Sequence, residues 1–426
     1  MLTRIAAFLL LAVLAHAQLA ITPTTTLAAE AVNNTAAPMS LANMPNGNPP
    51  PANVSKVPLR SLLYPEFNGL LLIHYMPWWG SHSHADLHIS EHDRDFVRRQ
   101  VEDMISRGFD GVIITEWNSN DWNTETTRAF IAEVAKHPNF QFALMENKGG
   151  LKKSGDPTGK LISDLQYAND HYFSQPNYIR IDGRPLITFF DADIDGLNWA
   201  RAKKEAAGNP LFVFRNAKGF RRDASDGAFA WTGESKPGDP SGLAYLEDFY
   251  HSADSGKIAI GSAYKGFNDS LASWSKGKVI PQRCGRTWLD TIGEANRFYS
   301  RKHQLQALQF ITWNDYEEGT ALETGIDNCA VMMATLDGPV LRFSPNFSSS
   351  DGTEATIDHY TVFVSQDGQR LMPLADVAAG THQLDLRRYQ LAPGNYSLFV
   401  KMVGRPMIRN QMSAAVPWVV AAQPAR

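Results

Sequence analysis

The sequence of 426 residues predicts an α/β protein, in which a (β/α)8 TIM barrel is followed by a small all-β sandwich. Eight apolar runs follow one another between Gly69 and Glu318, and each ends in polar or aromatic residues. After about residue 341 the pattern changes to short alternating runs separated by turns. Strands that are apolar throughout suit a parallel sheet covered on both faces, whereas alternation suits strands with one exposed face.

The eight runs are predicted to be the strands of the barrel. In order they are Gly69–Gly80, Gly111–Asn118, Phe140–Lys148, Arg184–Asp193, Leu211–Asn216, Gly227–Glu234, Lys257–Asp269 and Leu305–Glu318. The sixth is the weakest of them. Eight strands within about 250 residues match the usual size of a (β/α)8 barrel. The alternative, a doubly wound open sheet, is disfavoured because no G-x-G-x-x-G motif follows the first run.

A helix is predicted after the first run. Ser90 and Asp93 have the spacing of a capping box, which would start the helix at Ser90. Gly108 is placed to end it. An apolar stripe at helical spacing is formed by Val97, Val101, Met104 and Ile105.

The first residues predict export. Arg4 precedes the apolar segment Ile5–Leu14, and Ala15-His16-Ala17 forms a small-x-small cleavage site. Residues 1–17 are therefore predicted to be a signal peptide, and the protein to be secreted, periplasmic or extracellular. Residues 18–60 are rich in Pro, Thr and Ala and are predicted to be an arm or linker. No later segment is apolar over the length of a membrane span, so we expect no membrane partner after cleavage.

The net charge bears on possible partners, and the cysteine content bears on disulfide formation. The net charge of −4 gives no reason to expect nucleic acid as a partner, and we expect a monomer. Cys284 and Cys329 are the two cysteines, and an even pair in an exported protein predicts one disulfide, with two buried thiols as the alternative.

The C-terminal part, residues 339–426, is predicted to be an immunoglobulin-like or fibronectin-like β-sandwich, and residues 61–338 to be the barrel. LAPGNYSLFV (391–400) has the turn and alternating strand of such domains. We expect a packing module that stabilises the barrel, with polysaccharide binding as the alternative.

Carboxylates, amides and aromatic rings collect at the predicted carboxyl ends of the barrel strands, where active sites of such barrels lie. Aromatic rings can stack on sugar rings, and carboxylates and amides can bind hydroxyls. This mixture predicts a carbohydrate cleft that binds a polysaccharide or oligosaccharide. The candidate substrate-binding residues are Tyr75, Trp78, Trp79, Glu116, Trp117, Glu146, Asp191, Trp231, Tyr264, Trp313 and Asn314.

Two motifs resemble known families. HYMPWWG (74–80) is similar to the YYPWYG-type opening of the glycoside hydrolase family 99 group. TWNDYEEGT (312–320) resembles both the WNDYGES-type signature of family 71, the endo-α-1,3-glucanases, and the NEWHEGTQIE signature of family 99, the endo-α-mannosidases and mannanases. The resemblance covers roughly residues 68–335.

The resemblance implies a glycoside hydrolase without a cofactor, with Asp315 and Glu318 as its catalytic pair. The Asp at position 315 leans to family 71. That implies an inverting endo-α-1,3-glucanase, with Glu318 as general acid and Asp315 as general base. EEGTALE (317–323) is closer to family 99, which implies a retaining endo-α-mannosidase in which Asp315 deprotonates the substrate's 2-hydroxyl.

Two other classes of function remain as alternatives. His82, His84, His88 and His92 follow the first run, as in metal-dependent amidohydrolases, but the fifth and sixth strand ends offer no His or Lys to complete a ligand set. We therefore expect no metal and a polar loop, from which one of these histidines, such as His82, could reach the substrate. The second alternative is a glycan-binding barrel without catalysis.

Overall fold

The computed structural model describes residues 44, 46–48, 53–253 and 256–422. The predicted signal peptide lies outside the described residues. No helix within those described ranges has the length and hydropathy needed to cross a bilayer.

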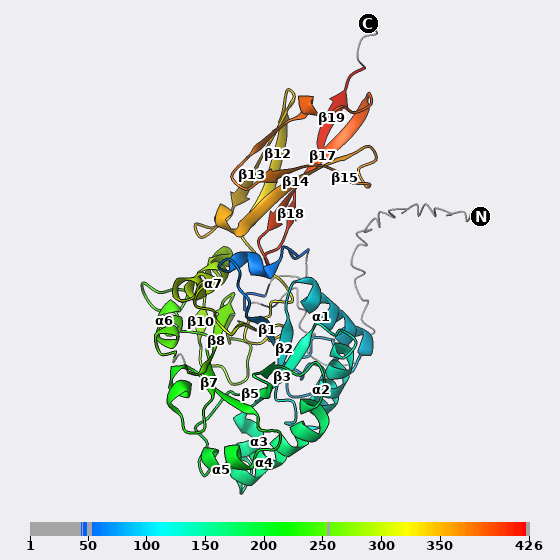
Figure 1. Cartoon of the computed structure of the whole chain (residues 1–426). Coiled ribbons are helices and arrows are strands. Elements are labelled where there is room, and N and C mark those ends of the chain that lie inside the picture. The colour runs from blue at the N-terminus through cyan, green and yellow to red at the C-terminus, as the bar shows by residue number, and fades with distance from the viewer. Residues whose placement is uncertain (1–43, 45, 49–52, 254–255, 423–426) are drawn as a thin grey trace, which may run out of the picture. The chain divides into compact units, whose positions relative to one another are not determined.

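The eight predicted runs form a closed parallel barrel (Figure 1), which confirms the predicted fold class. The sheet runs in the order β3-β2-β1-β11-β8-β7-β6-β5, and β3 pairs with β5 to close it, with Leu144 opposite Ile187. The barrel strands are β1 (Leu70–Tyr75), β2 (Gly111–Thr115), β3 (Gln141–Glu146), β5 (Arg184–Phe189), β6 (Leu211–Arg215), β7 (Gly227–Phe229), β8 (Ile258–Tyr264) and β11 (Ala307–Ile311).

The weak sixth run is a genuine strand, β7, and its backbone passes close to that of β8. A Cβ atom at Gly227 would lie 2.2 Å from the carbonyl oxygen of Ile258 on the neighbouring strand. Only glycine therefore allows β7 to pair with β8 at this point. The remaining positions of the barrel strands are mostly fully buried, as expected for strands covered on both faces.

Helices and short elements connect the strands. The α-helices are α1 (Arg94–Ser106), α2 (Asp121–Val134), α3 (Lys148–Lys152), α4 (Pro157–Ala168), α5 (Trp199–Glu205), α6 (Leu243–His251) and α7 (Arg286–Phe298). Two short hairpin pieces, β9 (Phe267–Asn268) and β10 (Val279–Ile280), pair antiparallel in the loop after β8, and β4 (Arg180–Ile181) pairs antiparallel with β5. Single turns of 3-10 or π helix are η2 (Leu59–Leu62), η3 (Asn169–Phe173), η4 (Ala217–Arg221), η5 (Arg283–Gly285), η6 (Glu354–Thr356) and η7 (Leu386–Arg388).

The first predicted helix begins one turn later than its capping box implied. Asp93, not Ser90, is the N-cap of α1, because its carboxylate accepts the backbone N–H of Asp95. The Ser90 hydroxyl accepts the N–H of His92 in the preceding turn instead. The predicted end is confirmed, since Gly108 follows the helix with a φ of 92°, a conformation that favours glycine.

The C-terminal residues form two antiparallel sheets around a second hydrophobic core that includes Leu341, Tyr360 and Leu398. One sheet contains β12 (Ala330–Asp337), β13 (Val340–Phe347) and β16 (Gln383–Asp385). The other contains β14 (Ile357–Ser365), β15 (Met372–Ala378), β17 (Gly394–Gly404), β18 (Gln411–Met412) and β19 (Val416–Val420). Because β12 pairs along its whole length with β13, these sheets begin at Ala330, ahead of the predicted boundary at 338.

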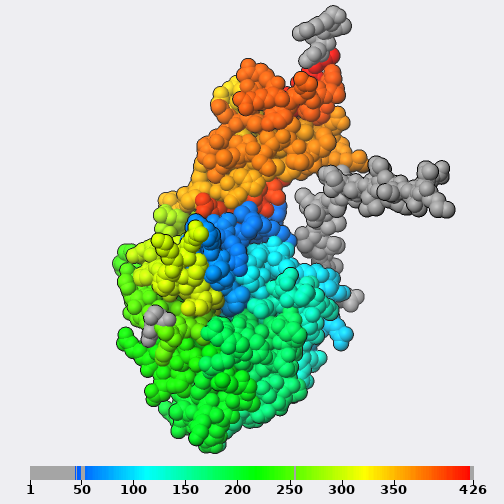
Figure 2. Space-filling model, in the orientation of Figure 1, coloured from blue at the N-terminus to red at the C-terminus, as the bar shows by residue number. Residues whose placement is uncertain are grey.

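The described part of the predicted arm packs onto the barrel. Met44, Asn46 and Asn48 are buried, and η2 buries Leu59. Figure 2 shows the blue residues of this segment lying against the barrel surface rather than extending from it. A polar composition therefore did not prevent these residues from packing, because their amides find partners inside the protein.

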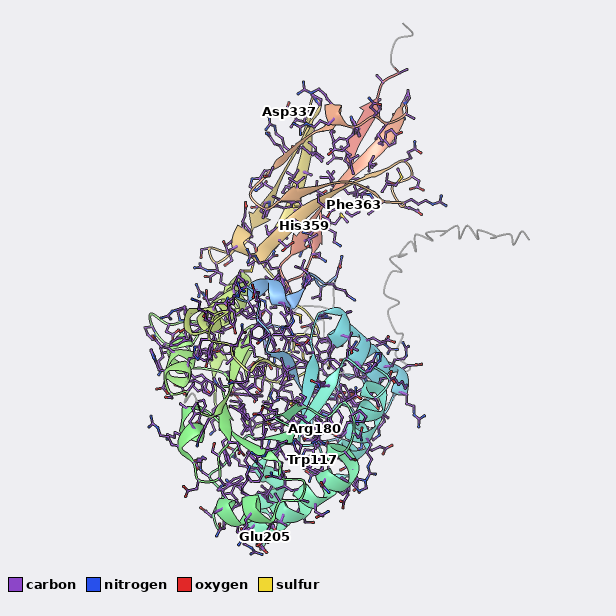
Figure 3. The ribbon with its side chains drawn as sticks, in the orientation of Figure 1. Trp117, Arg180, Glu205, Asp337, His359 and Phe363 are labelled. Atoms are coloured by element: carbon purple, nitrogen blue, oxygen red, sulfur yellow. A yellow bond between two sulfur atoms is a disulfide. The ribbon has the colours of Figure 1, made fainter. Side chains whose placement is uncertain are left out.

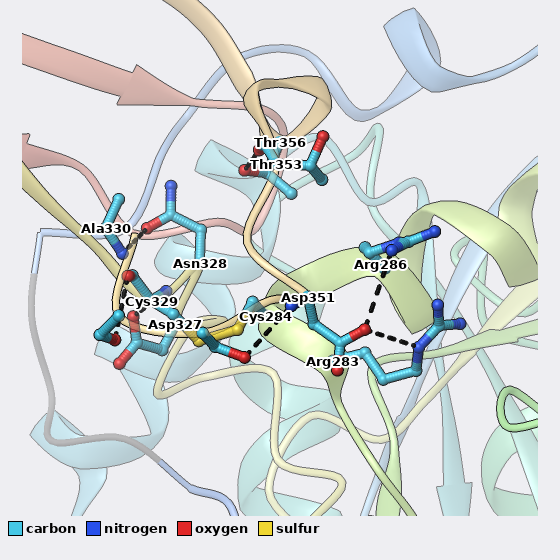
Figure 4. Close-up of a disulfide and its surroundings, with 12 residues drawn as sticks. Arg283, Cys284, Arg286, Asp327, Asn328, Cys329, Ala330, Asp351, Thr353 and Thr356 are labelled. Atoms are coloured by element: carbon cyan, nitrogen blue, oxygen red, sulfur yellow. Dashed lines mark hydrogen bonds and ion pairs between the residues drawn. A yellow bond between two sulfur atoms is a disulfide. The ribbon is translucent and has the colours of Figure 1, made fainter. Parts of the chain in front are cut away.

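The predicted disulfide is present. Cys284 and Cys329 are joined, with their Cα atoms 5.3 Å apart, so the alternative of two free thiols is wrong. Close to it, Asp351 accepts a hydrogen bond from Arg283 Nε at 3.3 Å and forms an ion pair with Arg286 (Figure 4).

Candidate active site

A cavity of about 330 Å³ opens at the carboxyl ends of the barrel strands. Five of the residues predicted for the site lie in its wall, namely Trp78, Glu116, Trp231, Asp315 and Glu318. The other lining residues are Met76, His84, Thr115, Met145, Asn147, Phe190 and Trp274.

Asp315 and Glu318 reach this cavity from one tight turn after β11. The Asp315 N–H donates to Thr312 Oγ1 at 2.9 Å, and the Glu318 N–H donates to Asp315 Oδ1 at 3.0 Å. The Thr320 N–H closes the turn by donating to the Asp315 carbonyl at 3.2 Å. Two carboxyl groups three residues apart are thereby brought to the same wall of one cavity.

Burial changes the acidity of both groups. The pKa of Asp315 is raised well above its usual value, first by burial and then by the charge of Glu318. Burial also raises the pKa of Glu318, while the indole N–H of Trp274, which donates to Glu318 Oε1 at 3.1 Å, lowers it. The pair therefore keeps a proton at a pH at which a solvated carboxyl group would be ionised.

An aromatic and imidazole wall stands beside the pair. His84 stacks on Trp78 with ring centroids 4.5 Å apart, and Trp274 meets the imidazole edge-on at 5.6 Å. His84 Nδ1 lies 2.8 Å from Glu317 Oε2, and the Ala85 N–H donates to the other oxygen of Glu317. Glu317 thus fixes the loop after β1 against the cavity. Of the loop histidines it is His84 that lies in the cavity wall, whereas His82, the example named from the sequence, is exposed.

The side of the cavity formed by β2 and β3 is polar. Asn147 donates its amide to Glu116 Oε1 at 2.6 Å, and burial raises the pKa of Glu116. Both residues also line a second cavity of about 260 Å³, which includes Glu146. Glu146, only 5% exposed, therefore lies beside the first cavity rather than in its wall.

Four predicted substrate-binding residues are buried under the turn instead of lining the cavity: Tyr75, Trp79, Trp313 and Asn314. Asn314 accepts the Met76 N–H at 2.9 Å and donates to Glu91 at 2.8 Å, and Glu91 in turn accepts the Trp79 N–H. These bonds join the end of β11 to the loop after β1.

Trp313 also packs beneath the turn rather than facing the cavity. Its indole N–H donates to Gln100 Oε1 on α1, and the Arg107 guanidinium lies 4.8 Å from its ring centroid. Its place in the motif is therefore explained by packing beneath the turn.

Trp117, Tyr264 and Asp191 lie away from the cavity wall as well. Trp117 (Figure 3) packs against Tyr167 and is fully buried. The buried Tyr264 hydroxyl donates to the Ser241 carbonyl, in the segment before α6, at 2.9 Å. Asp191 is paired with Lys148 and Arg215, at 3.0 and 3.3 Å.

The histidines of the loop after β1 form no metal site in the described part of the chain. Among residues 44–422 that are described, no group of three or more His, Cys, Asp or Glu side chains is arranged to hold a metal ion. His92 stacks on Trp122 at 3.6 Å, while His88 faces Asp86. The loop histidines are therefore directed to different partners.

Sequence reasoning missed Trp274, His84 and Phe190 as lining residues. Trp274 lies in the loop between β9 and β10, where no periodic pattern marks which side chains face inward. A tryptophan in a glycine- and serine-rich loop after a barrel strand was the available signal for it.

No family model and no curated protein matches the chain. Among solved structures, the GH99 endo-α-mannosidase of Bacteroides thetaiotaomicron in complex with bis-tris propane is 18% identical, with a TM-score of 0.50, over 60% of this chain and 87% of that chain. A second structure of a GH99 endo-α-mannosidase from this organism is 16% identical, with a TM-score of 0.49, over 60% of this chain and 88% of that chain. A glycoside hydrolase-like protein is 14% identical, with a TM-score of 0.45, over 61% and 88%.

The first of these similarities shows that the chain shares the barrel fold of a GH99 endo-α-mannosidase.

Proposed function

We propose that the protein is a secreted glycoside hydrolase that cleaves α-linked mannose polymers within the chain, in the manner of family 99. The observation that carries the proposal is the placement of Asp315 and Glu318 on one turn in the wall of the cavity at the barrel's carboxyl end. The fold shared with a GH99 endo-α-mannosidase favours this family over the endo-α-1,3-glucanases.

Glu318 is assigned as the general acid and Asp315 as the general base. Glycoside cleavage needs one protonated carboxyl group for the leaving oxygen and one carboxylate to activate the attacking group. Glu318 accepts the Trp274 indole N–H on Oε1, which leaves Oε2 to carry the proton. Burial raises the pKa of both groups, so the base role of Asp315 is assigned from its position in the motif.

In an α-mannoside the 2-oxygen and the leaving oxygen lie on opposite faces of the ring. Asp315 takes the proton of the 2-hydroxyl, the 2-oxygen forms a bond to C1, and the bond from C1 to the leaving oxygen breaks as Glu318 gives that oxygen its proton. Water then opens the 1,2-anhydro sugar: Glu318 takes its proton, and Asp315 returns a proton to the 2-oxygen. Two inversions at C1 give net retention.

An α-glucoside has its 2-hydroxyl on the same face as the leaving oxygen, so this route is closed to it. The Asp at position 315, where family 71 also has Asp, makes an inverting endo-α-1,3-glucanase the second candidate. Configuration of the substrate and stereochemical outcome are therefore linked, and one experiment decides both.

The test is to incubate the secreted protein with α-mannan and with insoluble α-1,3-glucan and to follow the first-formed anomer by proton NMR. Mannose oligomers released as the α-anomer support the proposal. Glucose oligomers released first as the β-anomer would replace it with the glucanase. Absence of products from both polymers would reject both candidates.

A further inference from the structure

We propose that the N-terminal segment around Asn46 and Asn48 is part of the active site, where the two asparagines are positioning residues for the turn that carries Asp315 and Glu318. The segment belongs to the arm that its composition assigns to a linker. The inference rests on the proposed function for its kinetic effect, although the structural contact can be tested without it.

The asparagines bind the backbone of the catalytic turn directly. Asn46 Nδ2 donates to the carbonyl oxygens of Tyr316 and Glu317, the latter at 3.0 Å. Asn48 Nδ2 donates to the same Tyr316 carbonyl at 2.9 Å and to Asn46 Oδ1 at 3.1 Å. Tyr316 and Glu317 are the two residues between Asp315 and Glu318, so these bonds hold the centre of the turn.

A buried lysine connects the segment to the far end of the turn. Lys265, directly after β8, donates to Asn48 Oδ1 at 3.1 Å and to the Ala321 carbonyl at 2.6 Å. Its Nζ also lies 3.4 Å from Thr324 Oγ1. The carboxamide of Asn48 thereby links the middle of the turn to the residues that follow it.

The fit between the segment and the turn is close. Asn46 and Asn48 are 2% and 3% exposed. A Cβ atom at Gly319 would lie 2.3 Å from the Asn46 carbonyl oxygen, so the turn needs glycine where the segment passes. Met44 is buried in the hydrophobic core, and Gln282 donates to the Gly47 carbonyl, which anchors the segment on both sides of Asn46.

Loss of these bonds should displace the catalytic carboxyl groups. Without the amide of Asn46, two buried carbonyl oxygens of the turn lose a donor, and the turn can regain hydrogen bonds only by moving or by admitting water. A displacement of about 1 Å in a catalytic group lowers the rate by up to about a hundred-fold.

The test compares Asn46→Ala and Asn48→Ala with a matched control, Asn53→Ala. Asn53 is an exposed asparagine of the same arm, and its side chain bonds to Asn410 rather than to the turn. Each variant is made in the full chain and examined by hydrogen–deuterium exchange and by kinetics on the polymer that the wild type cleaves. Asn48→Ala loses one of the two donors to Tyr316 and serves if Asn46→Ala does not fold.

The proposal expects about ten-fold faster exchange confined to residues 313–324. It also expects kcat to fall by about ten- to a hundred-fold while KM changes by less than about two-fold. Asn53→Ala should change neither quantity. Unchanged exchange in the turn, faster exchange throughout the barrel, or a wild-type kcat in both test variants would each overturn it. If the wild type cleaves neither polymer, the proposed function fails, while exchange in residues 313–324 still decides whether the segment holds the turn.

Discussion

Two pairs of carboxyl groups lie close together in this protein and have different surroundings; Asp315 and Glu91 are buried, and Glu318 and Glu323 are partly buried. Asp315 and Glu318, the upper pair, line the cavity, whereas Glu91 and Glu323, the lower pair, bond to Asn314 and Tyr316 of the same turn. Burial is the first cause of a raised pKa in all four groups. Burial alone therefore does not mark a catalytic acid.

The two pairs differ in whether their carboxyl oxygens are accessible from the cavity. The oxygens of Glu91 accept the N–H of Trp79 and the amide of Asn314, and those of Glu323 meet the Gln100 amide and the Tyr316 hydroxyl. The lower pair is thus bound to protein groups and holds the turn in place. The upper pair has a cavity of about 330 Å³ in front of it, into which a sugar can enter.

The largest effect is expected from the upper pair. Asp315→Asn and Glu318→Gln each remove proton transfer while keeping the shape of the side chain, and should lower kcat by about a thousand-fold. Binding of the glycan, measured by isothermal calorimetry, should change little. If both variants still turned over the substrate, catalysis would belong to other residues. Asp315 and Glu318 would then differ from Glu91 and Glu323 in access alone and not in function.

The lower pair should instead affect stability. Burial raises the pKa of Glu323 to about 7. Because the folded pKa lies above that of the unfolded chain, the contribution of Glu323 to stability is complete below about pH 4.5 and is lost as the pH rises to 7.

Replacing Glu323 with Gln removes the titrating carboxyl group, and with it the loss of stability between pH 4.5 and pH 7. Between pH 4.5 and pH 7 the unfolding free energy of Glu323→Gln should rise relative to that of the wild type by about 3 kcal/mol. Urea denaturation at the two pH values measures the difference. A constant difference between the proteins would show that Glu323 does not titrate in this range.

The pH profile of activity tests the upper pair again, with a smaller effect. One member must be ionised and the other protonated, so kcat/KM should follow a bell-shaped curve. Since burial raises both pKa values, both limbs should lie above those of solvated carboxyl groups, which titrate near pH 4. An acidic limb at or below pH 4 would contradict the enclosed setting of the pair.

The smallest effect is expected at Trp274. Its indole N–H stabilises the ionised form of Glu318, so Trp274→Phe should raise the pKa of that acid. The alkaline limb of the kcat/KM profile should move upward, by about one pH unit or less. Trp199→Phe is a suitable control, because its indole N–H donates to the Ala192 carbonyl instead. If the two variants gave the same pH profile of kcat/KM, Trp274 would have no effect on the pKa of Glu318.

The strands of the barrel were predictable because burial on both faces leaves an apolar run in the sequence. Even the weak sixth run forms β7, with glycine where the neighbouring backbone is close. The start of α1 was misplaced because Ser90 and Asp93 can both act as caps, and only the folded chain shows which one meets a free N–H.

The candidate site was predictable in part. Asp315 and Glu318 could be found because their spacing matches a known motif and follows a buried strand. Trp313 and Asn314 share that motif but face the supporting side, since neighbouring residues on a turn point in different directions. The sequence does not encode that direction locally.

The sequence by itself determined the barrel, the C-terminal sheets, the disulfide partners and the position of the carboxylate pair, because each depends on local pattern or on residue type. Only the tertiary structure placed His84 and Trp274 beside that pair, and Asn46 and Asn48 behind it. These residues are separated from the turn by long stretches of chain and lie in loops without periodicity. Their contacts depend on how the closed barrel brings its loops together.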